Sequence, residues 1–211
     1  YVPEFITVHL ARPSQPGENV TVPFQDYIKN VASSEIYSTW PEEALKANIL
    51  AQVSFALNRV YTEWYPSMGY DFDITNSTAF DQSFVYGRDI FENISTIVDE
   101  IFNSYLQRRG SVEPLFAAYC DGREVQCNGL SQWGSVTLAE DGLLPYEILQ
   151  NYYGENAEKV HHAVSLVCHI LYSERAAVPS AAKSLPLYTG TLYFARWHLS
   201  YGAFSIRLRF I

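Results

Sequence analysis

The segment from Thr39 to Val60 constrains the fold most, because it carries the clearest helix signal in this chain of 211 residues. Thr39 and Glu42 have the spacing of a capping box, and Pro41 suits the first turn of a helix, where a missing N–H costs no hydrogen bond. Apolar side chains then recur at steps of three or four residues: Leu45, Ile49, Val53, Ala56 and Val60. The sequence therefore predicts a long helix over about residues 40–63 that packs one face on a core.

The composition limits the classes of protein to consider. Hydrophobic residues make up 48% of the chain and charged residues 18%, which is enough for one sizeable packed domain. A formal net charge of −9 disfavours nucleic acid as a partner, because non-specific binding to phosphates needs clustered cations. No stretch of about 18 apolar residues is present, so we expect no membrane-spanning helix.

Upstream of the long helix, the pattern predicts two strands and a short helix. Residues 5–10 and 20–24 are rich in β-branched and apolar side chains, as strands are. Residues 25–32 place Tyr27, Ile28 and Val31 on one face of a helix that we expect to end near residues 33–34. This arrangement puts Glu35 in a connection between two helices.

Downstream, the same reasoning predicts a strand over residues 70–74, a helix over 88–108, a strand over 112–120, and short helices over 135–141 and 145–153. The helix over 88–108 rests on an apolar stripe that ends at Tyr105. We therefore expect an α+β fold, a mixed α/β single domain in which small sheets pack around the long central helix. The candidate groove lies at the N-terminus of that helix, beside Glu35.

The composition changes after Gly154. The last 57 residues carry six basic and three acidic side chains, whereas the chain as a whole is acidic, and four of the five histidines lie there. Such a shift is typical of a boundary. We expect a domain over residues 1–154 and an unassigned basic tail over 155–211, in which residues 157–172 could form a helix and 192–210 strands.

Glu35 is the strongest candidate for chemistry. An arbitrary glutamate in a connection is usually a surface charge, but Glu35 has Ile36, Tyr37 and Trp40 as apolar and aromatic neighbours. Partial burial beside such side chains raises the pKa of a carboxyl group, which is what a general acid needs.

Three cysteines are present, and two of them, Cys120 and Cys127, are close in sequence. We expect a local disulfide between Cys120 and Cys127, ahead of free thiols and then of a zinc site. Zinc is disfavoured because it usually takes four protein ligands in a structural site and no histidine lies near this pair. Cys168 is interpreted as a buried or incidental thiol. We expect no cofactor.

Two blocks of sequence resemble the stage II sporulation protein D family, which includes the LytB-type amidase enhancers. The first surrounds Glu35 and continues through Trp40-Pro41 and Glu43-Ala-Leu-Lys-Ala47. The second is Gly129-Leu-Ser-Gln-Trp-Gly134, followed by a segment that begins Tyr146-Glu-Ile-Leu. The resemblance covers about residues 5–154. The stretch before the second block, Val125-Gln-Cys-Asn-Gly129, lacks the histidine that is usual in the family.

The resemblance implies an extracytoplasmic bacterial protein that acts on the glycan strands of peptidoglycan, with a wall amidase as a further partner. It implies lytic transglycosylation between N-acetylmuramic acid and N-acetylglucosamine, with Glu35 as acid and then base. This reaction needs one carboxylate, because a hydroxyl group of the substrate and not water is the nucleophile. The alternatives are a peptidoglycan-binding or amidase-enhancer module without turnover, and a structural component of the spore coat or envelope.

Other side chains are candidates for glycan contacts. Amides can bind N-acetyl and hydroxyl groups, and aromatic rings can stack on sugar faces. The candidates are Gln82, Ser131, Gln132, Trp133 and Tyr37, with Tyr119 as a weaker one. We expect Glu35, Gln82 and Gln132 to converge on one groove.

Overall fold

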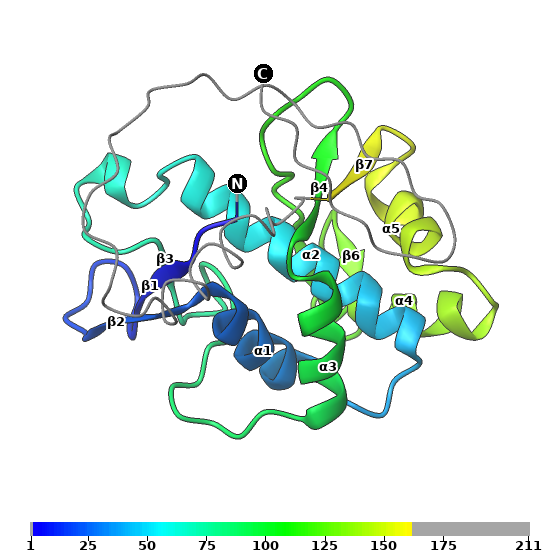
Figure 1. The fold of residues 1–211 in the computed structure, drawn as a ribbon, viewed down its shortest axis with the longest axis horizontal. Coiled ribbons are helices and arrows are strands. Elements are labelled where there is room, and N and C mark those ends of the chain that lie inside the picture. Colours follow the sequence, from blue (N-terminus) through cyan, green and yellow to red (C-terminus); the bar gives the residue numbers. More distant parts are fainter. Residues whose placement is uncertain (1, 162–211) are drawn as a thin grey trace, which may run out of the picture. The chain divides into compact units, whose positions relative to one another are not determined.

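The computed structural model describes residues 2–161, which combine helices with small sheets (Figure 1). The expected α+β class is confirmed. In chain order the elements are β1 (Phe5–His9), β2 (Asn19–Pro23), α1 (Phe24–Glu35), α2 (Glu42–Tyr61), the 3-10 helix η1 (Pro66–Met68), β3 (Ile74–Thr75), α3 (Glu92–Ile101), β4 (Ser104–Arg108), β5 (Tyr119–Cys120), β6 (Leu130–Ser131), α4 (Gln132–Glu140), α5 (Pro145–Tyr153) and β7 (Ala157–His161).

Helix α2 lies against most of the other elements, with α1, α3, α4, α5 and β4 packed on it. Its side chains are buried almost continuously from Ala44 to Arg59, so it presents a core on nearly every side and not only along the predicted stripe. The helix begins after Pro41 without a side-chain cap, so the predicted capping box at Thr39 does not form. The side-chain NH2 groups of Asn48 and Gln52 lie within this core, where they donate to Ser135 and to Glu35.

The N-terminal part of the chain forms a three-stranded sheet in the order β2-β1-β3 (Figure 1). Strand β1 pairs antiparallel with β2 and parallel with β3, so that Val8 lies opposite both Val20 and Ile74. Ile6 and Val8 alternate with more exposed neighbours and are fully buried, as a strand with one covered face requires. The sheet leads directly into α1 through Pro23 and Phe24.

The predicted helix over residues 88–108 is wrong in its second half. Helix α3 ends at Ile101, and residues 104–108 form β4, which pairs antiparallel with β7. The pattern misled because Tyr105 falls on the helical period of α3, while the pairing partner of β4 lies about 50 residues further on. The same pairing makes residues 157–161 a strand and not the start of a helix. The pairing of β4 with β7 also extends past residue 154, where the composition changes.

A further pairing joins β5 and β6, which run parallel just before α4. The strand expected over residues 112–120 is reduced to Tyr119–Cys120, with an isolated bridge between Gln107 and Pro114. Helix α5 has the expected bounds, while α4 begins three residues earlier than expected. Cys168 and the strands expected over 192–210 lie outside the described residues.

Candidate functional site

Glu35 is the last residue of α1, and its carboxylate accepts three hydrogen bonds from three different parts of the chain. The backbone N–H of Ser83 donates to Oε1 over 2.7 Å. The hydroxyl of Tyr119 and the side-chain amide of Gln52 both donate to Oε2, over 2.6 and 2.9 Å. The acid is therefore held in one position by α1, α2, the segment after β3, and β5.

Burial raises the pKa of Glu35 from its ordinary value of 4.5 to about 7. The three hydrogen bonds favour the charged form and lower the pKa, but the loss of water around the carboxylate has the larger effect. Burial, with the nearby Glu35 charge, also raises the pKa of Tyr119, so its hydroxyl stays protonated and remains a donor. Near neutral pH, Glu35 thus exists in both protonation states, which suits proton transfer in either direction.

Gln82 is completely buried and supports Glu35 indirectly. Its amide donates to the hydroxyl of Tyr119 over 2.9 Å and to the carbonyl of Gln52 over 3.2 Å, while its own oxygen accepts from Tyr27 over 3.0 Å. These contacts fix the direction of the Tyr119 hydroxyl toward Glu35. The expectation that Gln82 contacts a glycan is corrected, because its polar atoms are engaged and none is at the surface.

The segment from Ser83 to Phe91 is attached to α1 along its length. The side-chain amide of Asn30 donates to the carbonyl of Val85 over 2.8 Å and accepts from its N–H over 2.9 Å, as a neighbouring strand would. Further along, the Phe91 N–H donates to the Ser33 hydroxyl over 3.4 Å. Together with the bond from Ser83 to Glu35, these contacts form one wall of the site.

A pocket of roughly 360 Å³ opens beside Glu35, and residues of this wall and of the α1–α2 connection line it. Glu35 is the only carboxylate among the lining side chains, and Arg88 is the only cation. The lining is Ser33, Ser34, Glu35, Ile36, Tyr37, Ser38, Thr39, Arg88 and Phe91. The sequence pattern identified Glu35 and Tyr37 in this set and missed Arg88, whose neighbours in sequence carry no motif.

An aromatic cluster lies next to this pocket. The ring centroids of Tyr37 and Trp133 are 5.7 Å apart, and those of Trp40 and Trp133 are 4.9 Å apart. Tyr37 is 62% exposed, whereas the guanidinium of Arg123 covers the Trp133 ring at 3.4 Å from its centroid. The structure thus brings Tyr37 and Trp133 together beside Glu35, with Tyr37 as the more accessible surface.

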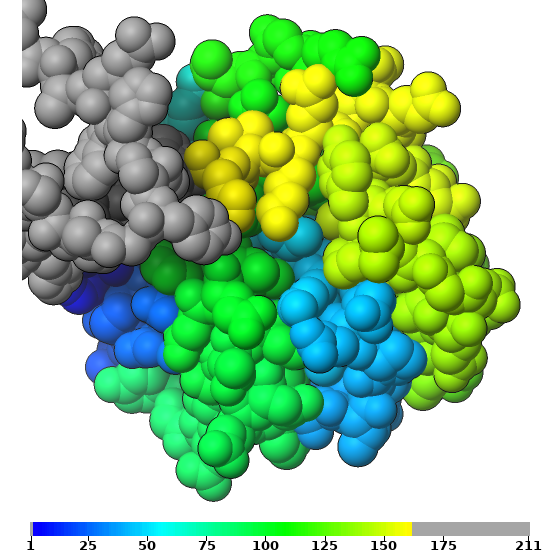
Figure 2. Space-filling model, turned by 45° about the vertical axis from the view of Figure 1, so that its right-hand side comes forward, coloured from blue at the N-terminus to red at the C-terminus, as the bar shows by residue number. Residues whose placement is uncertain are grey.

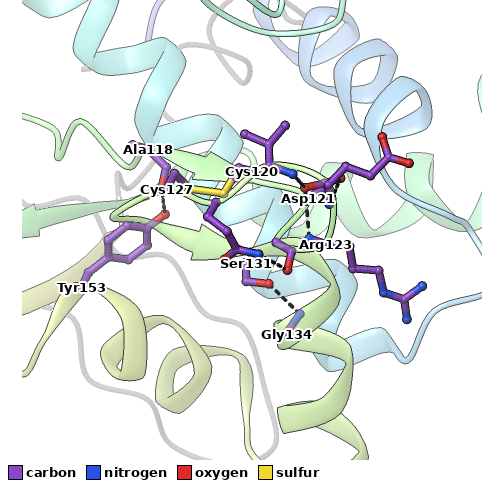
Figure 3. The surroundings of a disulfide bond; sticks show 12 residues. Ala118, Cys120, Asp121, Arg123, Cys127, Ser131, Gly134 and Tyr153 are labelled. Carbon is purple, nitrogen blue, oxygen red and sulfur yellow. Dashed lines mark hydrogen bonds between the residues drawn. A yellow bond between two sulfur atoms is a disulfide. The ribbon is translucent and has the colours of Figure 1, made fainter.

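Ser131 and Gln132 have structural contacts. The Ser131 hydroxyl caps α4 by accepting from the N–H of Gly134 over 2.9 Å (Figure 3). Gln132 is 7% exposed, and its carbonyl accepts from Ser135, which in turn accepts from Asn48 on α2. These contacts place α4, and with it Trp133, against α2. Glu35 and Gln82 are linked through Tyr119. The convergence of Gln132 on this group stays a prediction.

Cys120 and Cys127 form a disulfide at the end of β5 (Figure 3). Inside the loop that it closes, the Asp121 carboxylate accepts from the N–H groups of Val125 and Arg123, and these bonds lower its pKa. The Trp133 N–H donates to the Asp121 carbonyl. The loop therefore connects β5, which carries Tyr119, to the start of α4, which carries Trp133. Within residues 2–161, no three His, Cys, Asp or Glu side chains gather as metal ligands would.

The first block of sequence contains Glu35, and two of the three donors to its carboxylate, Gln52 and Ser83, also lie between residues 15 and 102. Residues 15–102 match the family model of SpoIID, the stage II sporulation protein. This match confirms the resemblance for the first block, whereas the second block lies outside it, and it indicates a sporulation-related function at the cell wall. It spans α1, α2 and α3 and includes Glu35, Gln52 and Arg88. No curated protein matches the chain.

The SpoIID match ends before β4, so Tyr119 and the disulfide loop lie outside it. They nevertheless complete the surroundings of Glu35, as the hydrogen bond from Tyr119 shows. Among the helices of the described part of the chain, none combines the length and the apolar character that a membrane crossing requires.

Proposed function

We propose that this protein is a peptidoglycan lytic transglycosylase that cleaves the bond between N-acetylmuramic acid and N-acetylglucosamine, with Glu35 as acid and then base. One observation carries the proposal: Glu35 has a pKa raised to about 7 and is the only carboxylate lining its pocket. A hydrolase of the usual kind needs a second carboxyl group to activate water or to attack the sugar. A lytic transglycosylase needs only one.

The hydrogen bonds favour one oxygen of Glu35 as the carrier of the proton. Oε2 already accepts from Tyr119 and Gln52, whereas Oε1 accepts only from the N–H of Ser83. Oε1 thus keeps a lone pair that can hold a proton for transfer. The donors on Oε2 stay in place through both steps and stabilise the carboxylate once the proton has left.

The reaction balances without water. Glu35 gives its proton to the glycosidic oxygen, the bond from that oxygen to C1 of the muramic acid breaks, and the glucosamine sugar leaves as an alcohol. The C6 hydroxyl of the same muramic acid then bonds to C1 and closes the 1,6-anhydro ring. Its proton passes to Glu35, which is restored to the acid form.

Two further features support glycan as the ligand and a location outside the cytoplasm. The exposed ring of Tyr37 beside the pocket is suited to stacking on a sugar face. The disulfide between Cys120 and Cys127 is of a kind that persists in oxidising compartments.

A second candidate is a peptidoglycan-binding or amidase-enhancer module without turnover. The stretch from Val125 to Gly129, which lacks the usual family histidine, favours it. The two functions differ in whether covalent bonds of the glycan are broken, so one digestion separates them.

The test is digestion of purified glycan strands, followed by mass spectrometry of the ends. Wild type should release 1,6-anhydromuramyl ends, and Glu35→Gln should release none. Glu140→Gln, an exposed glutamate at the end of α4, is the matched control and should act as wild type. Strands that bind wild type and remain uncut would contradict the lytic function and favour the binding module.

A further inference from the structure

We infer that Arg88 is a specificity-determining residue that binds the carboxylate of the muramic acid lactyl group. This inference rests on the proposed function and adds the group that the site recognises. Arg88 and Glu35 line the same pocket of roughly 360 Å³ and bring opposite charges to it.

In the described part of the chain, Arg88 forms no ion pair with an acid, unlike three other cations on α1 and α2. Lys29 pairs with Asp99, Lys46 with Glu42, and Arg59 with Asp81. Within residues 2–161, the Arg88 guanidinium has no carboxylate oxygen within the 4.0 Å that defines an ion pair. Its polar contacts there are with neutral groups: Nη1 donates to the Ser34 hydroxyl over 2.8 Å, and Nε donates to the carbonyl of Asp89 over 3.2 Å.

The position of Arg88 is fixed relative to the acid. Its contact with Ser34 ties it to the residue next to Glu35, and Ser34 itself donates to the carbonyl of Asn30 over 2.8 Å. The segment that carries Arg88 is held to α1 on both sides, at Val85 and at Phe91. A cation held in this way is pre-organised for a ligand and loses little side-chain freedom on binding.

The chemistry of the substrate supplies a matching anion. A guanidinium presents parallel N–H groups that fit a carboxylate, and such charge-assisted bonds are stronger than neutral ones. On glycan strands without stem peptides, the lactyl carboxylate is free, and it is on the same sugar ring as the C1 atom at which Glu35 acts. One ring can therefore place its C1 at Glu35 and its carboxylate at Arg88 within a single pocket.

The experiment measures binding without turnover, in the Glu35→Gln background, so that it does not depend on catalysis. The probes are glycan strands with free lactyl carboxylates and the same strands after amidation with methylamine, which removes the charge. The protein with Arg88 should bind the free strands about tenfold or more tightly than the amidated ones, as expected for a charge-assisted pair. With Arg88→Gln added, the two kinds of strand should bind equally, at the weaker level.

Two further variants sharpen the result. Arg88→Lys keeps the charge but lacks the parallel N–H groups of a guanidinium. The preference for free strands should therefore become smaller without vanishing. Arg12→Gln removes an exposed arginine in the β1–β2 loop and should keep the full preference. A preference that survives Arg88→Gln, or equal or absent binding of both strands by the parent protein, would overturn the inference. Failure of the proposed function is seen separately, as uncut strands with wild type.

Discussion

At the scale of single residues, the site depends on a balance at Glu35. Loss of water raises the pKa of the acid, and the hydrogen bonds from Ser83, Tyr119 and Gln52 limit that rise to about 7. Each of these donors thus lowers the pKa of Glu35. Sequence neighbours such as Trp40 suggested the burial, but the three donors are 17 to 84 residues away from Glu35 and no local pattern reveals them.

The first prediction concerns the pH dependence of cleavage. The acid must be protonated to act, so kcat/KM of wild type should fall as the pH rises above about 7. Tyr119→Phe removes a donor that lowers the pKa of Glu35, so the fall should move to higher pH. Glycan cleavage measured from pH 5 to 9 checks this. Tyr61→Phe, on an exposed ring, should leave the profile unchanged, and a shift of the Tyr119→Phe profile toward lower pH would contradict the role given to Tyr119.

The second prediction concerns stability. The folded state raises the pKa of Glu35 from 4.5 to about 7, so between these values it binds more protons than the unfolded state. Stability should therefore fall as the pH rises through this window, by at most about 3 kcal/mol from this group. Glu35→Gln cannot ionise and should lack this part of the slope, which urea unfolding at pH 4.5, 6 and 7.5 measures. Equal slopes for wild type and Glu35→Gln would mean that the carboxyl is not desolvated.

At the scale of elements, the wall that carries Ser83 and Arg88 begins at a buried ion pair. The Asp81 carboxylate accepts from Arg59 over 2.9 Å, from Tyr65 over 2.6 Å and from the N–H and hydroxyl of Thr75. These contacts join α2 to β3 immediately before Gln82. The wall is consequently fixed at its origin by Asp81 and along its length by α1.

The third prediction follows from this pair. Asp81→Asn leaves the Arg59 charge without its counter-ion, although Arg59 is 8% exposed. Unpairing a buried charge costs about 3–5 kcal/mol, so the free energy of unfolding should fall by that order. Chemical denaturation measures it, and Asp89→Asn, an exposed aspartate on the same wall, is the control. A loss no larger than that of the control would show that the pair contributes little.

The fourth prediction concerns the join between β5 and β6. A Cβ at Gly129 would lie 1.9 Å from the carbonyl oxygen of Ala118, so Gly129→Ala must displace the strand that leads to Tyr119. At Gly110, with φ of 80°, a Cβ meets no atom within 4 Å. Gly110→Ala should cost about 1 kcal/mol and keep activity, whereas Gly129→Ala should cost more and reduce glycan cleavage. Thermal unfolding and cleavage assays on both variants test this prediction. Full activity of Gly129→Ala would contradict the displacement of the strand that leads to Tyr119.

Elements that depend on local pattern were foreseen, and those that depend on distant partners were not. The bounds of α5 follow from Pro145 at its start and Gly154 at its end, both local signals. Strand β4 could not be foreseen, because its five residues continue a helical period and only β7 makes them a strand. The same limit hid Gln52, which lies off the apolar stripe of α2 but points to the acid.

At the scale of the whole described unit, three groups of elements contact α2: the N-terminal sheet through β3, the β4–β7 pair through β4, and the disulfide loop through α4. On the face shown in Figure 2, the start of α2 and the residues before it, in light blue, lie between α3 in green and the α4–α5 region in yellow-green. A second pocket lies along the border with α3, between Trp40 and Asn93. The exposed residues of the site thus come from elements that only the complete fold brings together.

The fifth prediction concerns the disulfide. Replacing Cys127 with Ser opens a loop with a sequence separation of seven residues, which should lower the free energy of unfolding by about 2–3 kcal/mol. Because the loop joins Tyr119 to Trp133, glycan cleavage should fall as well, and reductant should have the same effect on wild type only. Ser95→Ala, away from the loop, is the control. A reduced protein with unchanged stability and activity would contradict this role.

Because four parts of the chain hold Glu35, its pKa depends on each of them being in place. If α1, the wall or β5 moves away, water reaches the carboxylate and its pKa returns toward 4.5. A loosened copy of the protein then holds no proton to give at neutral pH and cannot cut. Under the proposed lytic function, the protein would therefore cleave glycan only in its complete fold and would be inactive while it unfolds, refolds or is degraded.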